Sequence, residues 1–289
     1  MSAHSVAEVV PGASAADRAV TVIQPTKGWI GLQLRELWSF RELWYFLIWR
    51  DVKVRYKQTL LGGAWAVIPP VLMMIVFTVV LRRVGHFSSD GKPYALFSYA
   101  ALVPWTLFTA ALTGVSDSMV ANSQLVSKIY FPRLLLPLAA ATAPLVDFGI
   151  ALGLLAILMA VFSTAPTLAA LLIPLLVLLT LVSALAFGLW FSALNVRYRD
   201  FRYTVPFMIQ LGLFITPVAY ATSSLPNAAQ KILALNPMTG VIEGFRWALL
   251  DTAAPSVSTL AISVTATIVL LVSGLAHFRR AERTFADII

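Results

Sequence analysis

The sequence predicts an all-α integral membrane protein with six transmembrane helices, an N-terminal interfacial helix, and short re-entrant or periplasmic helices between spans five and six. Two features of the composition lead to this fold class: 59% of the 289 residues are hydrophobic and only 12% are charged. A soluble domain carries about 25% charged residues. The third observation is a series of long uncharged segments, which gives the number of spans.

Residues 1–33 are expected to form a cytoplasmic tail, because they lack the charged start and apolar run of a signal peptide. Residues 34–58 then interleave aromatic rings with cations. Such side chains lie at the headgroup layer of a membrane, so we predict an amphipathic interface helix there. However, Val52, Val54 and Tyr56 alternate with charged residues at the period of a strand, which leaves the local shape open.

The spans follow in order, each needing about 20 apolar residues. Residues 59–81 and 93–116 are uncharged and form spans one and two. The only charge from Leu134 to Val196 is Asp147, and a turn at Ser163–Thr167 divides this region. The remaining spans are 138–162, 167–193, 203–222 and 252–278.

These spans form a membrane domain over residues 59–278, followed by a cytoplasmic tail at 279–289. Span one departs from an ideal helix, since it opens with Gly62-Gly63 and contains Pro69-Pro70, from which we expect a kink. The stretch between spans five and six is semi-apolar but is broken by Pro226 and Asn236-Pro237. It is too polar to span and too apolar for a free loop, so we predict re-entrant or interfacial helices.

The distribution of cations predicts the orientation. Six crossings bring both termini to one side, which carries 16 of the 21 Lys and Arg residues. The five on the other side are Arg82, Arg83, Lys92, Lys231 and Arg246. Cytoplasmic loops are rich in cations, so both termini are expected in the cytoplasm. The net charge of +8 is explained in the same way, and no nucleic-acid partner is expected.

Several classes of chemistry have no support in the sequence. There is no cysteine, and the three histidines (His4, His86 and His277) have no metal-ligand spacing. The stretch "GHFSSDGKP" at 85–93 has five residues between its glycines and Pro93 in place of a hydroxyl, so it is not a phosphate-binding loop. We therefore expect no catalytic residue, metal or cofactor in this chain.

Two features can each be interpreted in two ways. Asp147 is either a proton or substrate site, or a carboxylate near the cytoplasmic end of span three that is paired with a cation or backbone donors. Two G-x-x-x-G motifs, at 149–153 and 240–244, would let another helix approach closely, although such motifs also occur by chance.

Six stretches together resemble the transmembrane subunit of an ABC-2-type exporter, specifically the polysaccharide or O-antigen permease (Wzm type). They are "LIWRDVKVRYKQTLLGGAWAVIPP" (47–70), "SKIYFPRLLLPLA" (127–139), "LNVRYRDFRYTVPF" (194–207), "LFITPVAY" (213–220), "LNPMTGVIEGFRWALL" (235–250) and "FRRAERTFADII" (278–289). The resemblance runs from about Leu34 to the C-terminus. Permeases for teichoic acid and capsule share much of this pattern.

The resemblance implies a permease in the bacterial inner membrane that forms a homodimer and binds two copies of a separate ABC ATPase. ATP and Mg²⁺ would be bound by that ATPase. The substrate would be a glycan linked to undecaprenyl pyrophosphate or a similar lipid, extruded through a channel between the permeases. Membrane lipids would also contact the permease as partners.

The loop between spans two and three is implied to couple the permease to the ATPase. Lys128 and Arg133 would offer charge, Ile129, Tyr130 and Phe131 an apolar anchor, and Pro132 a fixed turn. The competing interpretation is a positively charged cytoplasmic loop with aromatic membrane anchors.

The cations before span one are implied to capture the pyrophosphate of the substrate. They are Arg50, Lys53, Arg55 and Lys57, which lie within eight residues. The competing interpretation is membrane anchoring, and both roles are compatible. Aromatic side chains that stack on sugar rings would line the channel, and the candidates are Trp65, Trp105, Phe108, Phe187, Trp190, Phe214 and Tyr220.

Two rival functions are also compatible with the sequence. An ABC-2 exporter of a drug or small lipid would share the architecture with another cargo. An ion-coupled secondary transporter would need more intramembrane acids than Asp147.

Overall fold

The computed structural model describes residues 34–57, 62–84, 88–198 and 200–285, and every regular element in these ranges is helical. The all-α prediction is thus confirmed for this part of the chain. The predicted tail at 1–33 and the last four residues, 286–289, lie outside the described residues.

Five helical segments in the described ranges are long and apolar enough to cross a membrane, and they match five of the six predicted spans. They are Gly62–Leu81, Tyr94–Ala121, Leu135–Val161, Leu168–Arg197 and Val257–Thr284. The remaining predicted span, 203–222, falls on helix α9 (Phe201–Ile215), which has only 15 residues. A helix of this length covers about 22 Å, less than the hydrocarbon thickness of about 30 Å.

The first span is built from three short elements instead of one kinked helix. A 3₁₀ turn η1 (Gly62–Ala66) precedes α3 (Ile68–Val76), which continues as a π-helix, η2 (Phe77–Val84). Gly62 opens the span with a φ of 49°, a conformation that glycine adopts without strain. Pro69 and Pro70 lie in the first turn of α3, where a missing N–H has no helical partner to lose. The prolines therefore start a helix, and the expected interior kink was wrong.

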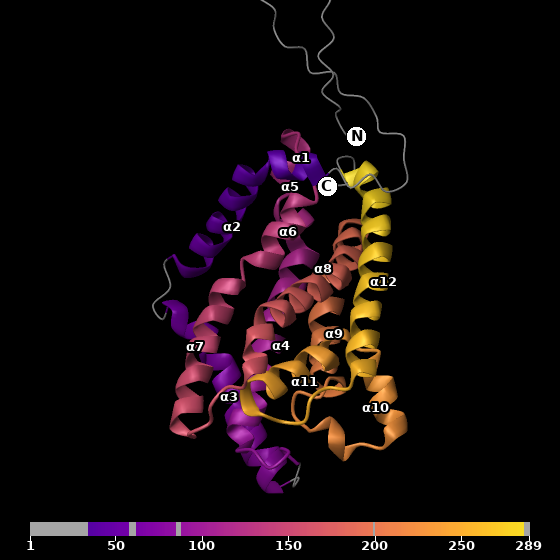
Figure 1. Ribbon diagram of the computed structural model, residues 1–289. Coiled ribbons are helices and arrows are strands. Elements are labelled where there is room, and N and C mark those ends of the chain that lie inside the picture. The colour runs from indigo at the N-terminus through magenta and orange to yellow at the C-terminus, as the bar shows by residue number, and fades with distance from the viewer. Residues whose placement is uncertain (1–33, 58–61, 85–87, 199, 286–289) are drawn as a thin grey trace, which may run out of the picture.

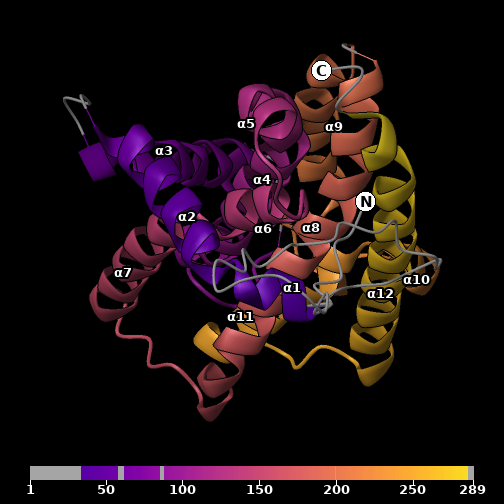
Figure 2. The same cartoon turned by 90° about the horizontal axis from the view of Figure 1, so that it is seen from above.

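Helix α4 (Tyr94–Ala121) is the centre of the bundle. It packs against α3, α6, α7, α8, α9 and α11, and the view from above shows these elements around it (Figure 2). In its most apolar window 78% of the residues are buried, against 11–28% in the other four spans. The other spans thus form one layer around α4 and leave apolar faces exposed.

The third and fourth spans form the predicted hairpin. Helix α6 (Leu135–Thr142) breaks before Pro144, and α7 (Leu145–Val161) continues the crossing. A turn around Ser163 leads into η3 (Leu168–Leu172) and α8 (Ile173–Arg197). Ser163 has a φ of 51°, the left-handed conformation that reverses the chain.

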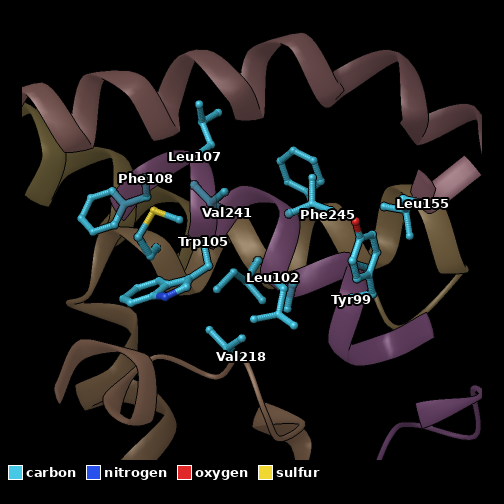
Figure 3. Close-up of a cluster of buried hydrophobic side chains, with 14 of the residues drawn as sticks. Tyr99, Leu102, Trp105, Leu107, Phe108, Leu155, Val218, Val241 and Phe245 are labelled. Carbon is cyan, nitrogen blue, oxygen red and sulfur yellow. The ribbon is translucent and has the colours of Figure 1, made fainter. Parts of the chain in front are cut away.

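Two short helices precede the last span at the end of the bundle opposite to α1 (Figure 1). They are α10 (Asn227–Ala234) and α11 (Pro237–Leu250), and α12 (Val257–Ala281) follows. Helix α11 has 14 residues, too few to cross, yet most of them are buried. Its side chains Val241 and Phe245 lie against Tyr99 and Trp105 of α4 (Figure 3).

The N-terminal helices lie at the other end of the bundle, with α5 (Ser123–Lys128) and the 3₁₀ turn η5 (Glu282–Thr284) (Figure 1). Helix α1 covers Leu34–Ser39, and α2 (Arg41–Tyr56) leans against α6. Val52 is buried whereas Val54 is 72% exposed, so these residues follow helical geometry and the strand-like alternation was misleading.

Glycines allow close helix contacts at four places in the described chain, among them Gly244, where an added methyl group would lie 2.9 Å from Leu176 Cδ2. A methyl group added to Gly188 would lie 2.4 Å from Val115 Cγ1, and one at Gly240 would lie 2.7 Å from Ser263 Oγ. A methyl group at Gly274 would lie 2.7 Å from the carbonyl oxygen of Ala186. In contrast, no atom lies within 4 Å of the corresponding positions at Gly149 and Gly153. Within this chain the 240–244 motif is therefore a packing motif, and the 149–153 motif is not.

We predict that Gly188→Ala lowers the stability of the purified protein, because the added methyl overlaps Val115 between α8 and α4. Overpacking of this kind costs about 1–3 kcal/mol. The measurement is the free energy of unfolding or the Tm in detergent, with Gly149→Ala as the matched control. Equal stability of the two variants would contradict the packing assignment.

Candidate functional site

A small polar space lies where α2 ends and the first span begins. Its volume is about 240 Å³, and its described lining consists of Arg55, Tyr56, Gly62, Trp65, Ala66 and Asp147. Two of the predicted site residues, Arg55 and Trp65, thus come together with the acid of span three. Lys57 is followed by residues 58–61, which lie outside the described ranges.

Asp147 is held by two side chains of α2. The Arg55 guanidinium forms an ion pair with the Asp147 carboxylate, and the Tyr56 hydroxyl donates a hydrogen bond to its other oxygen. The side chains of Arg55 and Asp147 are 43% and 23% exposed. The interpretation of Asp147 as a carboxylate paired with a cation is therefore confirmed.

Local sequence explains why these groups meet. Asp147 lies in the first turn of α7 after Pro144, where the helix dipole favours a negative charge. Helix α2 ends at Tyr56, because Lys57 has an extended backbone with a ψ of 132°. The last turn of α2 therefore presents Arg55 and Tyr56 to the start of α7.

The Tyr56 phenol is a hydrogen-bond donor at any physiological pH. Burial raises its pKa to about 12, and the hydrogen bond to Asp147 and the negative charge of Asp147 act in the same direction. The nearby Arg55 lowers this pKa but does not offset the rise. Tyr56 therefore keeps its proton and holds the carboxylate as a neutral donor.

The four cations predicted to capture the substrate divide between two sides of α2. Arg50, Lys53 and Lys57 follow the i, i+3, i+7 spacing of one helix face, whereas Arg55 lies on the opposite face. Lys53 and Lys57 are exposed. Lys53 lies 5.5 Å from the centre of the Trp49 ring, and Arg50 pairs with Asp51 at 2.8 Å.

The predicted coupling loop also divides its side chains between the protein and solvent. Lys128 is exposed, and Ile129 and Tyr130 are 56% and 46% exposed. Phe131 is only 7% exposed and belongs to the chain's own core, next to the half-buried Pro132. The large apolar or aromatic side chains of this loop that are exposed are therefore Ile129 and Tyr130.

Arg133 holds the C-terminal end of the described chain. Its guanidinium donates to the carbonyl oxygen of Glu282 in η5, and Glu282 pairs with Arg279 at 3.2 Å. The ring of Phe285 packs edge-on against Phe278 at 5.5 Å and is 1% exposed. Sequence reasoning missed this contact, since nothing in the two segments signals a side chain bonding a backbone 149 residues away.

The seven predicted channel aromatics have different surroundings in the single chain. Trp105, Phe108 and Phe187 form a cluster with ring separations of 5.6 and 6.2 Å, and Trp105 and Phe108 are buried. Trp190 stacks on the His277 ring at 4.4 Å and donates to Ser273.

The remaining three aromatics lie nearer the surface. Tyr220 donates to the carbonyl oxygen of Ile215 at 3.0 Å. Trp65 and Phe214 are 56% and 64% exposed. A channel role for the seven aromatics stays a prediction, and these two are the ones that the single chain leaves most open.

The most elaborate polar contact in the described chain was missed by sequence reasoning, which counted Arg246 as a cation of the outer loops. Arg246 is 3% exposed and lies inside the bundle on α11. Its guanidinium donates to the carbonyl oxygens of Pro217 at 2.8 Å, Val218 at 2.7 Å and Tyr220 at 3.2 Å. It also bonds the carbonyl of Phe97 and lies 3.5 Å from the centre of that ring. The sequence does contain one indication that Arg246 is buried, because it is a lone cation within the apolar run "FRWALL".

The Arg246 contacts explain how α9 ends. Residues 216–221 follow α9 outside any regular helix, yet Thr216, Val218 and Ala219 are buried. Carbonyl groups in such a segment need donors in place of water. Arg246 supplies them from α11, and the Tyr94 hydroxyl supplies another to Ala219.

These features define a multi-pass α-helical membrane protein in which one arginine is satisfied by backbone carbonyls and one acid is paired with a cation. The family described as "ABC-2 type transporter" matches residues 42–250, and the chain belongs to this family. The resemblance found in the sequence is thereby confirmed. Membership implies an ABC ATPase as the partner in general and a transport component as the role.

Two kinds of relative have informative names. The O-antigen export system permease protein RfbA of Myxococcus xanthus is 28% identical over 258 residues, covering 89% of this chain and 98% of the relative. A protein of the same name from Klebsiella pneumoniae is 28% identical over 241 residues, covering 83% and 92%. The polysialic acid transport protein KpsM of Escherichia coli is 22% identical over 239 residues, covering 82% and 92%.

Replacing Arg246 by Met should destabilise the protein strongly, because the carbonyls of the 216–221 segment lose their donors. Each buried carbonyl left unsatisfied costs about 1–3 kcal/mol. Arg246→Lys should recover only part of the loss, since an ammonium lacks the planar fork that reaches several carbonyls. Thermal unfolding in detergent is the measurement, with the exposed Lys231→Met as the control for removal of a cation. Wild-type stability of Arg246→Met would refute the assignment.

Proposed function

We propose that this chain is the transmembrane permease subunit of an ABC exporter that moves a lipid-linked polysaccharide of the O-antigen type across the bacterial inner membrane. ATP is hydrolysed by a separate ATPase subunit. The observation that carries this proposal is the similarity to permeases named for O-antigen export, which extends over 83–89% of the chain. The pairing of Asp147 with Arg55 agrees with a permease driven from outside the chain.

The proposal includes six crossings with both termini in the cytoplasm. Helix α9 starts near the C-terminal end of α8, and the segment after it reaches Tyr94 at the start of α4. In this arrangement the crossing is completed by the non-helical residues 216–221, three of whose carbonyls bond Arg246. On this view α10 and α11 are short helices at the periplasmic side, and α11 is re-entrant.

The proposed assembly is a homodimer of permeases with two ATPase subunits, and ATP and Mg²⁺ bind to the ATPase. The channel between the permeases needs faces that the single chain leaves open. Helix α9 offers one, with Tyr203, Phe207 and Phe214 exposed on it, and Trp65 offers a further aromatic surface near the cytoplasmic side. Aromatic rings would let a glycan slide without fixing one orientation.

The ATPase contact is proposed at the end of α5. Lys128, Ile129 and Tyr130 present a charge and two apolar side chains to a soluble partner, while Phe131 and Arg133 fix the loop to the permease. This division suits a coupling element, because a loop that transmits force must be anchored on its own side.

The similarity to KpsM supports a second candidate, export of a capsule-type polymer by the same mechanism. Export of teichoic acid, a drug or a small lipid would use this architecture with another cargo and has less support. An ion-coupled transporter has less support, since Asp147, the acid expected in span three, is held by Arg55 and Tyr56.

We predict that Ile129→Asp lowers the affinity for the ATPase subunit at least about tenfold, because it places a charge at the centre of an apolar contact. Co-purification of the ATPase with the permease measures the effect. Leu168→Asp is the matched control, since Leu168 is 90% exposed at the opposite end. Unchanged binding by Ile129→Asp would remove the loop from the interface.

The function itself is tested by loss of the gene product in its host. Cells lacking the permease should accumulate lipid-linked polymer at the cytoplasmic side, and re-expression should restore export. Mass spectrometry of the lipid co-purified with the permease and its ATPase identifies the cargo. Recovery of a drug or a glycan-free lipid would overturn the proposal.

A further inference from the structure

One arginine joins the turn after α12 to the loop between α5 and α6. Arg133 is half-buried, and its guanidinium donates to the carbonyl oxygen of Glu282 in η5. Among the described residues no carboxylate lies within 4 Å of this guanidinium, since the Glu282 side chain pairs with Arg279 instead. The contact therefore requires the backbone carbonyl at position 282 and not the acidic side chain.

Arg133 completes the C-terminal end of the last span. Helix α12 ends in η5, and the last carbonyl groups of a helix have no donors within it. The Glu282 carbonyl accepts from the N–H of Phe285 inside the turn, and Arg133 binds its remaining lone pair. A cation here also meets the negative end of the helix dipole. Arg133 is thus a cap for α12 that comes from a segment 149 residues away.

Aromatic side chains hold the same two segments together. Phe131 of the loop is buried in one cluster with Phe278 and Phe285, on either side of the end of α12. Lys128 and Ile129, in contrast, are exposed. The loop therefore has one part attached to α12 and one part open to a partner, and the attachment determines how the open part is presented.

Helix α12 runs from this attachment to the opposite end of the bundle (Figure 1). On the way, the hydroxyls of Thr267 and Ser183 join it to α8 at 3.0 Å. Near its start, the Ser263 hydroxyl donates to the carbonyl oxygen of Ala234 in α10 at 3.4 Å, and Gly240 lets α11 approach the same serine. A displacement of the loop that is carried by α12 therefore reaches α10 and α11.

We propose that Arg133 is a positioning residue for coupling: by capping Glu282 it fixes the loop to α12, so that the ATPase moves α12 when it moves the loop. This inference rests on the proposed function, since it assumes that the ATPase binds the loop. It differs from the role implied by the sequence, in which Arg133 offers its charge to the ATPase. Binding of the partner is left to the exposed loop residues, and transmission depends on a contact inside the permease.

The first experiment tests the attachment in the permease alone. The chain has no cysteine, so spin labels can be attached at Lys128→Cys beside the loop and Val272→Cys on α12, both exposed positions. The distribution of distances between the labels should be narrow in this background and should broaden in Arg133→Gln. Glu282→Gln is the matched control, because it breaks the pair with Arg279 and keeps the carbonyl. An unchanged distribution in Arg133→Gln would overturn the inference.

The second experiment separates binding of the ATPase from its effect on the permease. Arg133→Gln should bind the ATPase with an affinity within about twofold of the wild type, because Ile129 and Tyr130 stay exposed. The purified complex should keep its ATPase activity. In cells, surface polymer should fall about tenfold, since losing a hydrogen bond from a charged donor changes an equilibrium by about that factor. Glu282→Gln should export polymer at the wild-type rate.

Two other roles of Arg133 give different results. If its guanidinium contacts the ATPase directly, Arg133→Gln should lower the affinity, and higher salt should reduce the difference from the wild type. If Arg133 serves folding alone, Arg133→Gln should lower the Tm and the amount of permease, with wild-type export per folded molecule. Either result would contradict the inference.

A third measurement leaves Arg133 in place and therefore applies even if Arg133→Gln does not fold. A non-hydrolysable ATP analogue is added to the complex of the labelled permease with its ATPase. The distance between the labels at Lys128→Cys and Val272→Cys should stay the same, because the loop and α12 move together. The distance from Lys128→Cys to a label at the exposed Ile157→Cys on α7 should change. A change in the distance between the loop and α12 would refute the inference.

These outcomes also distinguish the inference from the proposed function. If the wild type and Arg133→Gln export polymer equally well, Arg133 has no part in coupling and the proposed function stands. If no ABC ATPase binds the wild type, the proposed function is wrong and the inference falls with it.

Discussion

The half of this bundle that contains α10 and α11 depends on the contacts of the Arg246 guanidinium. A membrane domain cannot leave backbone carbonyls without donors, so non-helical backbone needs side chains in place of water. Arg246 bonds three carbonyls of the segment after α9 and one of α4, while its charge lies against the Phe97 ring. This single side chain lets α9 stop after 15 residues and lets α11 turn back into the bundle.

Arg55, beside the start of the first span, is an arginine with different surroundings. Arg246 is almost fully buried and surrounded by fixed carbonyls, so its contacts are permanent. Arg55 is partly exposed and is paired with the carboxylate of Asp147. One arginine therefore holds backbone carbonyls inside the bundle, and the other joins α2 to the start of α7 where solvent reaches it. Burial and the number of partners distinguish these roles, although both residues are cations beside apolar segments.

The features of the fold that depend on local composition, the spans and the hairpin turn, could be predicted from the sequence. Five spans were located to within a few residues because each is a run of about 20 apolar residues, and the hairpin at Ser163 followed from its turn residues. Contacts between distant segments were not predictable in this way. Asp147 pairs with Arg55 across 92 positions, and Arg246 bonds a segment 26 to 29 residues away. The 149–153 and 240–244 motifs look alike, and only the neighbouring helices decide that the second one packs.

A single hydrophobic cluster connects the proposed ATPase contact with the polar space at Asp147. Leu47 of α2, Phe131 and Leu135 beside the coupling loop, and Phe278 and Phe285 at the C-terminal end are buried in it together. Helix α2 runs from this cluster to Arg55, and a helix moves as a nearly rigid body. A displacement of the loop would therefore reach the Arg55–Asp147 pair through α2. In the proposed function, α2 therefore links the packing around the ATPase contact to the Arg55–Asp147 pair.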